Sequence, residues 1–407
     1  MTPDYDFEHK PNGATGMLLC FVAFIALFMF SGLNPLRGSE DRWAEIPREM
    51  LLTGDFLHPA VNWQVSHLIP PLSFWLVLPG FLLFGFNEFA VRIPSGIAAI
   101  AGLYGTLELA RLLFDRKTAR LSGWLLVSCY GFLFWGRTAS ADTEIMALTV
   151  LMVWWFYHLE QSPRFWKYLV LYIFAALGIS CGSLFFCLIP LLFLVPHLVK
   201  EKNWKIHLNT GHFFALCIGL LLVGIQLYLA LKIAPAEGLQ QMPGYNQSLY
   251  ELLPGISQRI TQVIKNPASL MDALPLVARL LLPWTIFFLF SLGIALFRFK
   301  TLETDHRKLF CGGLLLTAAF ICFVPARWNH FLPLVPFCCI FTAAIFYQYP
   351  ENRGFDVLIH FMRWLLIISG SLAFASPIPL ILVSDELLTV LRFASVMRQT
   401  VYLWTSS

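Results

Sequence analysis

Long apolar segments separated by short polar ones dominate the hydrophobic pattern of the chain. Many are roughly 18 to 22 residues long, the length that an α-helix needs to cross a hydrocarbon layer. We therefore predict an all-α polytopic membrane protein with about 11 spans. The predicted spans are 17–33, 92–113, 121–135, 213–233, 274–297, 309–324, 331–346 and 364–383, a further span that ends before Arg164, and a short helical pair that turns near 179–182.

The region between the first two full spans has a different pattern. Residues 42–52 alternate as an amphipathic helix, with Trp43, Ile46 and Met50 on one face, which predicts a helix lying in the membrane interface. The apolar run 72–86 is about 15 residues long, which is short for a span, so we predict a second interfacial or half-inserted helix. Treating it as a span would invert the later topology and turn the basic clusters outward.

Basic residues set the orientation of the spans because cytoplasmic loops are enriched in Lys and Arg. In the predicted topology the basic clusters fall on one side: Arg111, Arg116, Lys117, Arg120, Arg164, Lys167, Lys200, Lys202, Lys205, Arg298, Lys300, Arg307 and Lys308. The opposite, outer face then receives Glu40, Asp41, Asp142, the turn near 179–182 and 327–330. We predict that 1–345 is the transmembrane module carrying the site, and that 346–407 adds membrane helices without a soluble domain.

The composition agrees with a membrane protein and excludes a soluble globular class. Hydrophobic residues make up 58% of the chain and charged residues only 13%. The net charge of +4 is too small to predict a nucleic-acid partner. The nine cysteines lie in or beside apolar segments and form no CxxC pair, which favours a packing role.

The densest cluster of charge follows the first span, in the sequence SEDRWAEIPREMLLTGDF at 39–56. Four later segments extend the pattern: PPLSFW at 70–75, FGFNEFAVRIPS at 84–95, RTASAD at 137–142 and FLPLVP at 331–336. In this order they resemble the polyprenol-phosphate-sugar-dependent glycosyltransferases of the GT-C superfamily. This branch contains the protein O-mannosyltransferases and the aminoarabinose transferase that modifies lipid A. The resemblance is strongest from 39 to 142.

The resemblance implies a GT-C-type transmembrane helix bundle with interfacial helices in its first outer loop. It also implies an inverting glycosyltransferase that moves a hexosyl or pentosyl group from a polyprenyl-phosphate donor to a lipid or surface-glycan acceptor of the outer leaflet. Its partners would be the lipid-linked sugar, the acceptor and membrane lipids. The expected location is the bacterial inner membrane, with the site on the periplasmic face. No cofactor is required, and a divalent cation remains an open alternative.

Three acids are candidates for the chemistry of transfer, which needs a base for the acceptor hydroxyl. Glu40 is the first candidate because it matches an acid of the family loop, and Asp41 is the second. Asp142 could orient the sugar or assist a metal ion. The structural alternative for these acids is capping of the helices that follow them.

Four cationic or imidazole side chains are candidates for binding the donor phosphate: Arg42, Arg137, Arg327 and His330. A guanidinium group suits phosphate oxygens because it offers parallel donors. The alternative for the arginines is extension toward lipid headgroups. For His58 and His67, in the first outer loop, we expect a plain surface or lipid-contact role.

The chain departs from the family pattern at three places. Ser39 stands where relatives carry an Asp, and Ile69 and Cys181 stand where they carry Lys. The missing lysines motivate an alternative, a non-catalytic partner of the same fold that binds lipid-linked glycan. A transporter is a weaker alternative, because the charges gather at one face and no inverted repeat is visible.

Overall fold

The computed structural model describes most of the first 348 residues. The described residues are 13–29, 31–65, 71–181, 184–201, 207–232, 240–241, 273–300, 302–323, 328–348, Phe361, Trp364 and Ile368. Arg327, His67, nearly all of the segment 234–272 between two predicted spans, and nearly all of the predicted span 364–383 lie outside them. The chain divides into two compact units, Met1–Ile359 and His360–Ser407. The predicted division at residue 345 stays a prediction.

The described part of the first unit is mainly helical. Its helices are α1 (Gly13–Phe28), α2 (Glu40–Thr53), α3 (Leu72–Trp75), α4 (Leu78–Phe84), α5 (Glu88–Leu113), α6 (Arg116–Val127), α7 (Tyr130–Trp135), α8 (Asp142–Gln161), α9 (Phe165–Cys181), α10 (Leu184–Glu201), α12 (Thr210–Lys232), α14 (Ala273–Leu280), α15 (Thr285–Phe297), α16 (Thr304–Phe323) and α17 (Val335–Gln348), with a 3-10 helix η2 (Trp328–Leu334). Strand β1 (Ala60–Val61) pairs antiparallel with β2 (Gln64–Val65), which pairs parallel with β3 (Gln240–Gln241).

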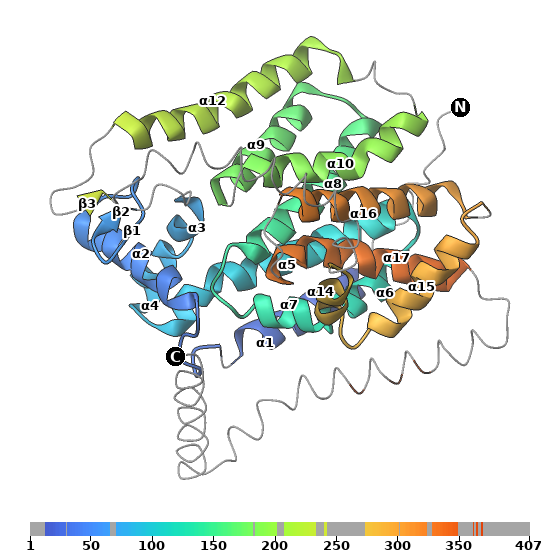
Figure 1. Cartoon of the computed structure of the whole chain (residues 1–407), viewed down its shortest axis with the longest axis horizontal. Helices are drawn as coiled ribbons and strands as arrows, with labels where there is room; N and C mark the ends of the chain where they lie inside the picture. Colours follow the sequence, from blue (N-terminus) through green and yellow to red (C-terminus); the bar gives the residue numbers. More distant parts are fainter. Residues whose placement is uncertain are drawn as a thin grey trace, which may run out of the picture. The chain divides into compact units, whose positions relative to one another are not determined.

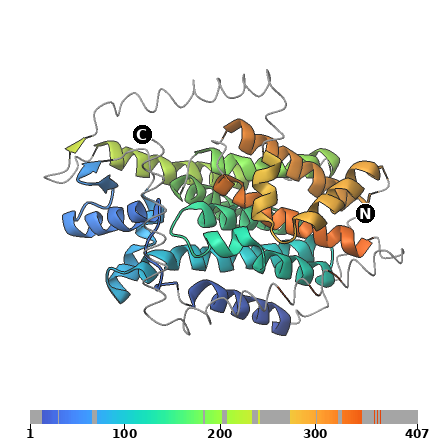
Figure 2. The same ribbon diagram turned by 60° about the horizontal axis from the view of Figure 1, so that its bottom comes forward.

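Helices α5 and α8 form the central packed pair because small residues of α5 let α8 approach closely. A Cβ atom added at Gly102 would lie 2.9 Å from Met146 Cε, and one at Gly105 would lie 3.0 Å from Leu151 Cδ2. Two views agree that α1 and α12 lie on opposite sides of this bundle (Figure 1 and Figure 2). They also agree that α2 and the strands gather at one end, away from α15 and α16.

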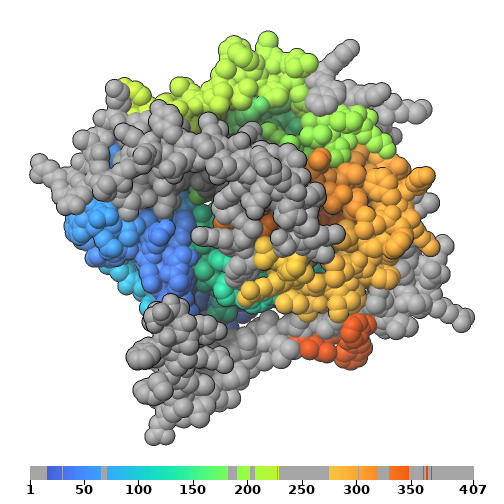
Figure 3. Space-filling view, viewed as in Figure 1, coloured from blue at the N-terminus to red at the C-terminus, as the bar shows by residue number. Residues whose placement is uncertain are grey.

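Helix α12 is peripheral and packs mainly on α9. A Cβ atom at Gly219 would lie 2.8 Å from Tyr172 Cβ of α9, so this glycine permits the close contact. The rest of α12 is open, with Phe213, Leu220 and Tyr228 each more than 60% exposed. The helix forms one edge of the molecule in the space-filling view (Figure 3). Exposed apolar side chains at this density fit contact with lipid rather than with water.

The predicted number of about 11 spans is not confirmed. Among the described residues, two helices are long and apolar enough to cross a membrane, Glu88–Leu113 and His330–Tyr347. Five shorter apolar helices accompany them: Gly16–Phe28, Leu72–Phe84, Phe165–Cys181, Thr210–Gln226 and Thr285–Phe297. The predicted short pair near 179–182 is longer than expected, since α9 has 17 residues and α10 has 18.

Two predicted spans are each broken into two helices. Span 274–297 is divided between α14 and α15, where Pro283 offers no N–H for a continuous helix. Span 121–135 is divided between α6 and α7 at 128–129. There the Ser128 hydroxyl donates to Trp124 O (2.6 Å) and accepts from Trp284 Nε1 (3.0 Å). The two breaks therefore face each other, which sequence periodicity alone does not reveal.

The first outer loop contains the predicted amphipathic helix. Helix α2 buries Ile46 and Met50, exposes Asp41, and ends at Gly54, whose φ of 71° is left-handed. The predicted helix 72–86 is instead two short helices, α3 and α4, and Gly85 (φ 76°) separates α4 from α5. The expectation of a helix over 42–52 is confirmed, and the helical stretch expected over 72–86 is present from Leu72 to Phe84, with a turn at 76–77 between α3 and α4.

Candidate active site

Glu40 is the centre of the polar contacts at the start of α2. Its side chain is buried and pairs with Arg92, the fifth residue of α5. Arg92 Nε donates to Oε1 and Nη2 donates to Oε2, each at 2.8 Å, in a parallel two-bond pair. The backbone N–H groups of Arg37 and Ala139 add bonds of 3.0 and 2.9 Å. Each carboxylate oxygen thus accepts two hydrogen bonds.

Arg92 also holds the chain that precedes α2. Its Nη1 donates to Ser31 O and to Asn34 O (2.9 Å), and its Nη2 donates to Pro35 O (3.2 Å). These acceptors are all backbone carbonyls of one loop. The guanidinium therefore ties the exit of α1, the start of α2 and the start of α5 into one unit.

The surroundings of Glu40 decide its protonation. Burial alone raises the pKa of Glu40, but the Arg92 guanidinium and the N–H groups of Ala139 and Arg37 outweigh it and hold the pKa below its ordinary value. Glu40 is therefore ionised at neutral pH. Since its oxygens are already occupied and its basicity is lowered, the contacts favour a positioning role over that of a base.

Asp41 has the opposite environment, although it is the next residue. It lies in the first turn of α2 and its side chain is exposed, as is that of Arg42. Trp43 follows and packs its ring 4.6 Å from the ring of Phe74 in α3. Asp41 and Arg42 are therefore available to a ligand at this surface, while the next side chain anchors the helix.

The turn 136–141 brings a second group of predicted residues to Glu40. Ala139 N–H donates to Glu40, and Ser95 Oγ of α5 donates to Ser140 O (3.2 Å). Arg137 Nη2 donates to Met29 O (3.1 Å), at the end of α1. Asp142 follows as the first residue of α8 and is half-buried. The structure thus brings together the segments that carry Glu40, Asp41, Arg42, Arg137 and Asp142.

His330 lies on η2, which packs against α8 and α14. Its side chain is half-buried. Arg327, the fourth predicted phosphate ligand, lies outside the described residues. Both η2 and the turn 136–141 therefore adjoin α8, and the phosphate-binding role of Arg327 and His330 stays a prediction.

Glu144 is a buried acid that the sequence analysis did not single out. It is 6% exposed, and its Oε2 has no hydrogen-bond partner in the described part of the chain. Cys181, at the end of α9, lies near this acid, and its carbonyl accepts a bond from Ser73 Oγ (3.3 Å). The only sequence signal was its place two residues after Asp142.

The expectation for His58 is wrong. The ring is 1% exposed, and Nδ1 lies 2.9 and 2.8 Å from the two carboxylate oxygens of Asp55. Asp55 Oδ1 also accepts from the backbone N–H groups of Leu57 and His58. This turn folds the imidazole back over the carboxylate, so His58 belongs to the packed base of the outer loop.

Comparison with known proteins adds a set of similar proteins and a fold to this geometry. Residues 69–228 match the family model described as dolichyl-phosphate-mannose-protein mannosyltransferase. The undecaprenyl phosphate-alpha-4-amino-4-deoxy-L-arabinose arabinosyl transferase 2 of Sodalis glossinidius (strain morsitans) is 29% identical over 195 residues. That match covers 46% of this chain and 35% of the relative. The chain spans about a third of the length of the curated relatives it matches.

The fold is decided by a solved structure. ArnT from Cupriavidus metallidurans bound to undecaprenyl phosphate superposes with a TM-score of 0.67 and 18% identity, covering 92% of this chain and 67% of ArnT. The chain has the GT-C fold. The arabinosyltransferase EmbB from Mycobacterium smegmatis is a further neighbour, with a TM-score of 0.52, 13% identity and coverage of 83% of this chain and 31% of EmbB. The predicted resemblance to the GT-C superfamily is confirmed.

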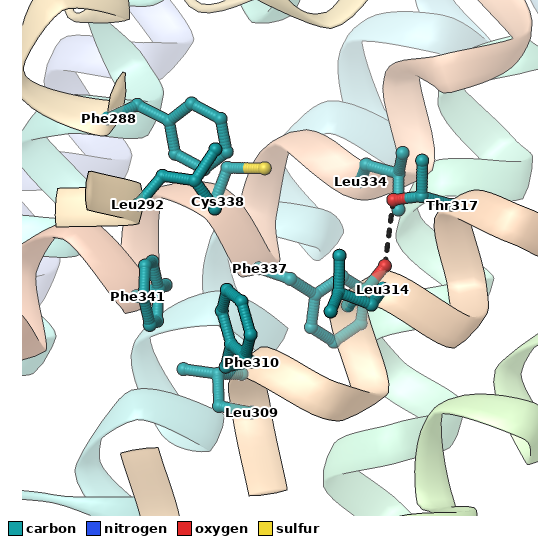
Figure 4. A pocket seen from close by; sticks show the side chains of 11 residues that line it. Phe288, Leu292, Leu309, Phe310, Leu314, Thr317, Leu334, Phe337, Cys338 and Phe341 are labelled. Carbon is teal, nitrogen blue, oxygen red and sulfur yellow. Dashed lines mark hydrogen bonds between the residues drawn. The ribbon is translucent and has the colours of Figure 1, made fainter. Parts of the chain in front are cut away.

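Within this GT-C fold, a small apolar cavity of about 80 Å³ lies between α15, α16 and α17. Figure 4 shows the rings of Phe288, Phe310 and Phe341 around it. The hydroxyl of Thr317, which lines the cavity, donates a hydrogen bond to Gly313 O (2.7 Å) within its own helix, so this donor is already used. The cavity suits a hydrocarbon group and offers nothing to a sugar or a phosphate.

A second polar cluster of the GT-C bundle occupies the far end of α8. Glu160 lies 2.5 Å from His197 Nε2 and 3.2 Å from His207 Nε2. Since α8 has 20 residues, this end is about 30 Å from Asp142. In the described residues no group of three or more His, Cys, Asp or Glu side chains could hold a metal ion.

Proposed function

We propose that the chain is a membrane glycosyltransferase that moves a sugar from a polyprenyl phosphate to a lipid or surface-glycan acceptor, with inversion at the anomeric carbon. The observation that carries the proposal is the buried Glu40–Arg92 pair. It joins the outer loop to the turn before Asp142 and leaves Asp41 exposed beside it. The names of the matched relatives support an undecaprenyl-phosphate sugar as donor.

In this proposal Asp41 is the base and Glu40 positions it. The Asp41 carboxylate takes the proton of the acceptor hydroxyl as the acceptor oxygen bonds to the anomeric carbon. The bond from that carbon to the phosphate oxygen breaks, and the electron pair leaves with the polyprenyl phosphate. Attack from the face opposite the leaving group inverts the configuration. A positioned base of this kind contributes about 10² to 10⁴ in rate.

The leaving phosphate needs cationic or hydrogen-bonding partners, and these often provide the larger part of catalysis. We assign this role to Arg42, Arg137, Arg327 and His330. Arg42 is exposed next to the proposed base, and the half-buried Arg137 donates from Nη2 to Met29 O. The family has lysines at the positions of Ile69 and Cys181, and these four residues would bind the phosphate in place of those lysines. Asp142 remains the candidate for orienting the sugar.

The proposed location is the bacterial inner membrane with this site at the periplasmic face. The relatives are undecaprenyl-phosphate-dependent enzymes by name, and the basic loops favour the opposite, cytoplasmic side.

The test is transfer activity in membranes that contain a mixed pool of polyprenyl-phosphate sugars, followed by mass spectrometry of total lipid. We expect a hexose- or pentose-sized mass gain with the wild type and a loss of about 10² to 10⁴ in rate with Asp41→Asn. Asp41→Glu should keep part of the rate, since it preserves a carboxylate. Full activity of Asp41→Asn, together with loss in a folded Glu40→Gln variant, would return the base to Glu40.

A second function is a non-catalytic partner of the same fold that binds lipid-linked glycan. The replacement of two family lysines by Ile69 and Cys181 is the observation that favours it. Absence of any mass gain with the folded wild-type protein, combined with retention of radiolabelled undecaprenyl phosphate on the purified chain, would select this function over the transferase.

A further inference from the structure

Two cysteines that are 210 positions apart in the chain touch in the core. The Sγ atoms of Cys129 and Cys339 are 3.8 Å apart, which is van der Waals contact with nothing between them. Both side chains are buried, at 0% and 2% exposure. The pair connects the junction of α6 and α7 to the first turns of α17.

Both partners sit on segments that other contacts hold in place. The N–H of Tyr130, next to Cys129, donates to Leu282 O (2.8 Å), and Cys129 Sγ lies 4.0 Å from Leu281 O. On the other side, Ile340 and Ala343 of α17 are fully buried. The two thiols are therefore kept facing each other by the fold, rather than meeting by chance at a mobile surface.

We infer that Cys129 and Cys339 are a disulfide modification site, closed by oxidation while the chain folds. A disulfide needs an Sγ–Sγ distance of about 2.05 Å, so the two sulfurs, now 3.8 Å apart, must approach by roughly 1.8 Å. Formation of this bond does not depend on the reaction proposed above.

The oxidant we invoke is a small disulfide such as oxidised glutathione. The thiolate of one cysteine attacks it and releases one glutathione thiolate, and the second cysteine then attacks the mixed disulfide and releases the other. Two protein thiols and one small disulfide thus give one protein disulfide and two glutathione thiols. A mixed disulfide does not fit into a site with 0% exposure, and both cysteines lie inside predicted spans, so the exchange precedes both membrane insertion and final packing of these segments.

Burial has a second consequence for this bond. Once the core has closed, a reductant in solution cannot reach the sulfurs, so the folded protein should keep the disulfide and lose it only on unfolding. The bond would join α7, which leads to the turn before Asp142, to α17, which follows η2 and His330. It would thereby fix two of the segments that carry candidate site residues.

The test is cell-free synthesis of the full chain into lipid nanodiscs, with oxidised glutathione in one reaction and reduced glutathione in another. After denaturation and alkylation, peptide mapping should find Cys129 linked to Cys339 only in the oxidised reaction, with the intact mass lower by two hydrogen atoms. Dithiothreitol added to the folded, oxidised protein should leave the link in place. The oxidised protein should also have a higher unfolding midpoint than the reduced protein.

Cys338 provides the matched control because it is the neighbour of Cys339 in α17 but faces the cavity of Figure 4. Cys338→Ser should retain the link, whereas Cys339→Ser and Cys129→Ser should abolish it. Alkylated, unlinked Cys129 and Cys339 in a correctly folded product of the oxidised reaction would overturn the inference. A link from Cys129 to Cys338 would overturn it as well.

Discussion

Two adjacent acids at the start of α2 differ in almost every physical respect. Glu40 is buried and accepts four hydrogen bonds, whereas Asp41 is exposed at the surface of the same turn. A helix turns by about 100° per residue, so neighbours in sequence point in different directions. This rotation separates the buried carboxylate of Glu40 from the exposed carboxylate of Asp41, which we propose as the base.

Arg92→Met should be strongly destabilising, because it leaves the Glu40 carboxylate and the carbonyls of the 31–35 loop without their partner. Breaking a buried pair by removing one member costs about 3 to 5 kcal/mol. The measurement is denaturant unfolding in detergent micelles. Arg111→Met is the matched control in the same helix, since Arg111 forms an exposed pair with Glu108 and should cost about 0 to 1 kcal/mol. Equal costs for the two variants would contradict the role assigned to Arg92.

The lowered pKa of Glu40 predicts a loss of stability in acid. The ionised folded form is favoured relative to an unfolded glutamate, whose pKa is about 4.3, so the stabilisation is present above that pH and disappears as the pH falls through the lower folded pKa. Thermal unfolding of the wild type and of Glu40→Gln between pH 7 and pH 3 measures this term. The gap between their midpoints should shrink as the pH falls below about 4.3. A gap that is constant over the range would show that Glu40 is not titrating as assigned.

At this scale the sequence identified the right segments but not the roles within them. Arg92 was part of the quoted signature, yet its partner Glu40 lies 52 positions away, and no local spacing connects the two. Asp55 and His58 are three residues apart, but only the turn that Asp55 caps reveals their pairing. Long-range pairing depends on the packing of whole helices, so it could not be read from periodicity.

The helices of the central bundle are the part of the fold that the sequence predicted best. The span expected at 92–113 ends at the observed residue and begins earlier, at Glu88, because the Asn87 side chain caps the helix by accepting from Ala90 N–H (2.9 Å). Two predicted spans are not continuous helices, because they are broken near 128–129 and Pro283. A serine or a proline can end a helix inside an apolar segment while the hydropathy of the segment stays high, so the hydropathy pattern does not reveal the break.

Gly131 shows how closely two of the broken helices approach. A Cβ atom there would lie 2.9 Å from Leu280 O of α14, and a backbone atom cannot rotate away. We expect Gly131→Ala to lower stability by about 1 to 3 kcal/mol, as overpacking does. Gly293→Ala in α15 is the control, because its added Cβ meets nothing within 4 Å and alanine favours the helix. Thermal unfolding of both variants is the measurement, and a neutral Gly131→Ala would mean that α7 and α14 are less tightly packed than observed.

Across the whole first unit, polar clusters mark the two ends of α8. The end at Asp142 meets the outer loop, and the end at Glu160 binds His197 and His207. The middle of the helix buries apolar side chains such as Met146 and Val150. This distribution fits a helix whose ends lie at two membrane surfaces.

The orientation of the chain can be tested at exposed positions of the two ends. With exposed Cys217 replaced by serine, Ser39→Cys should react with a membrane-impermeant maleimide in intact spheroplasts. Lys300→Cys, beyond α15, should react only after permeabilisation, because the basic loops are predicted to be cytoplasmic. Labelling of Lys300→Cys in intact spheroplasts would invert the topology and with it the proposed face of the site.

The guanidinium of Arg92 holds residues 31, 34 and 35 through their carbonyl oxygens alone. Every amino acid has the same backbone carbonyl, so these hydrogen bonds do not depend on which side chains residues 31, 34 and 35 carry. The loop before Glu40 can therefore accumulate substitutions while its path is preserved. A side-chain change in this loop that keeps the backbone path leaves the anchor intact, whereas a change at Arg92 or at its partner Glu40 removes it.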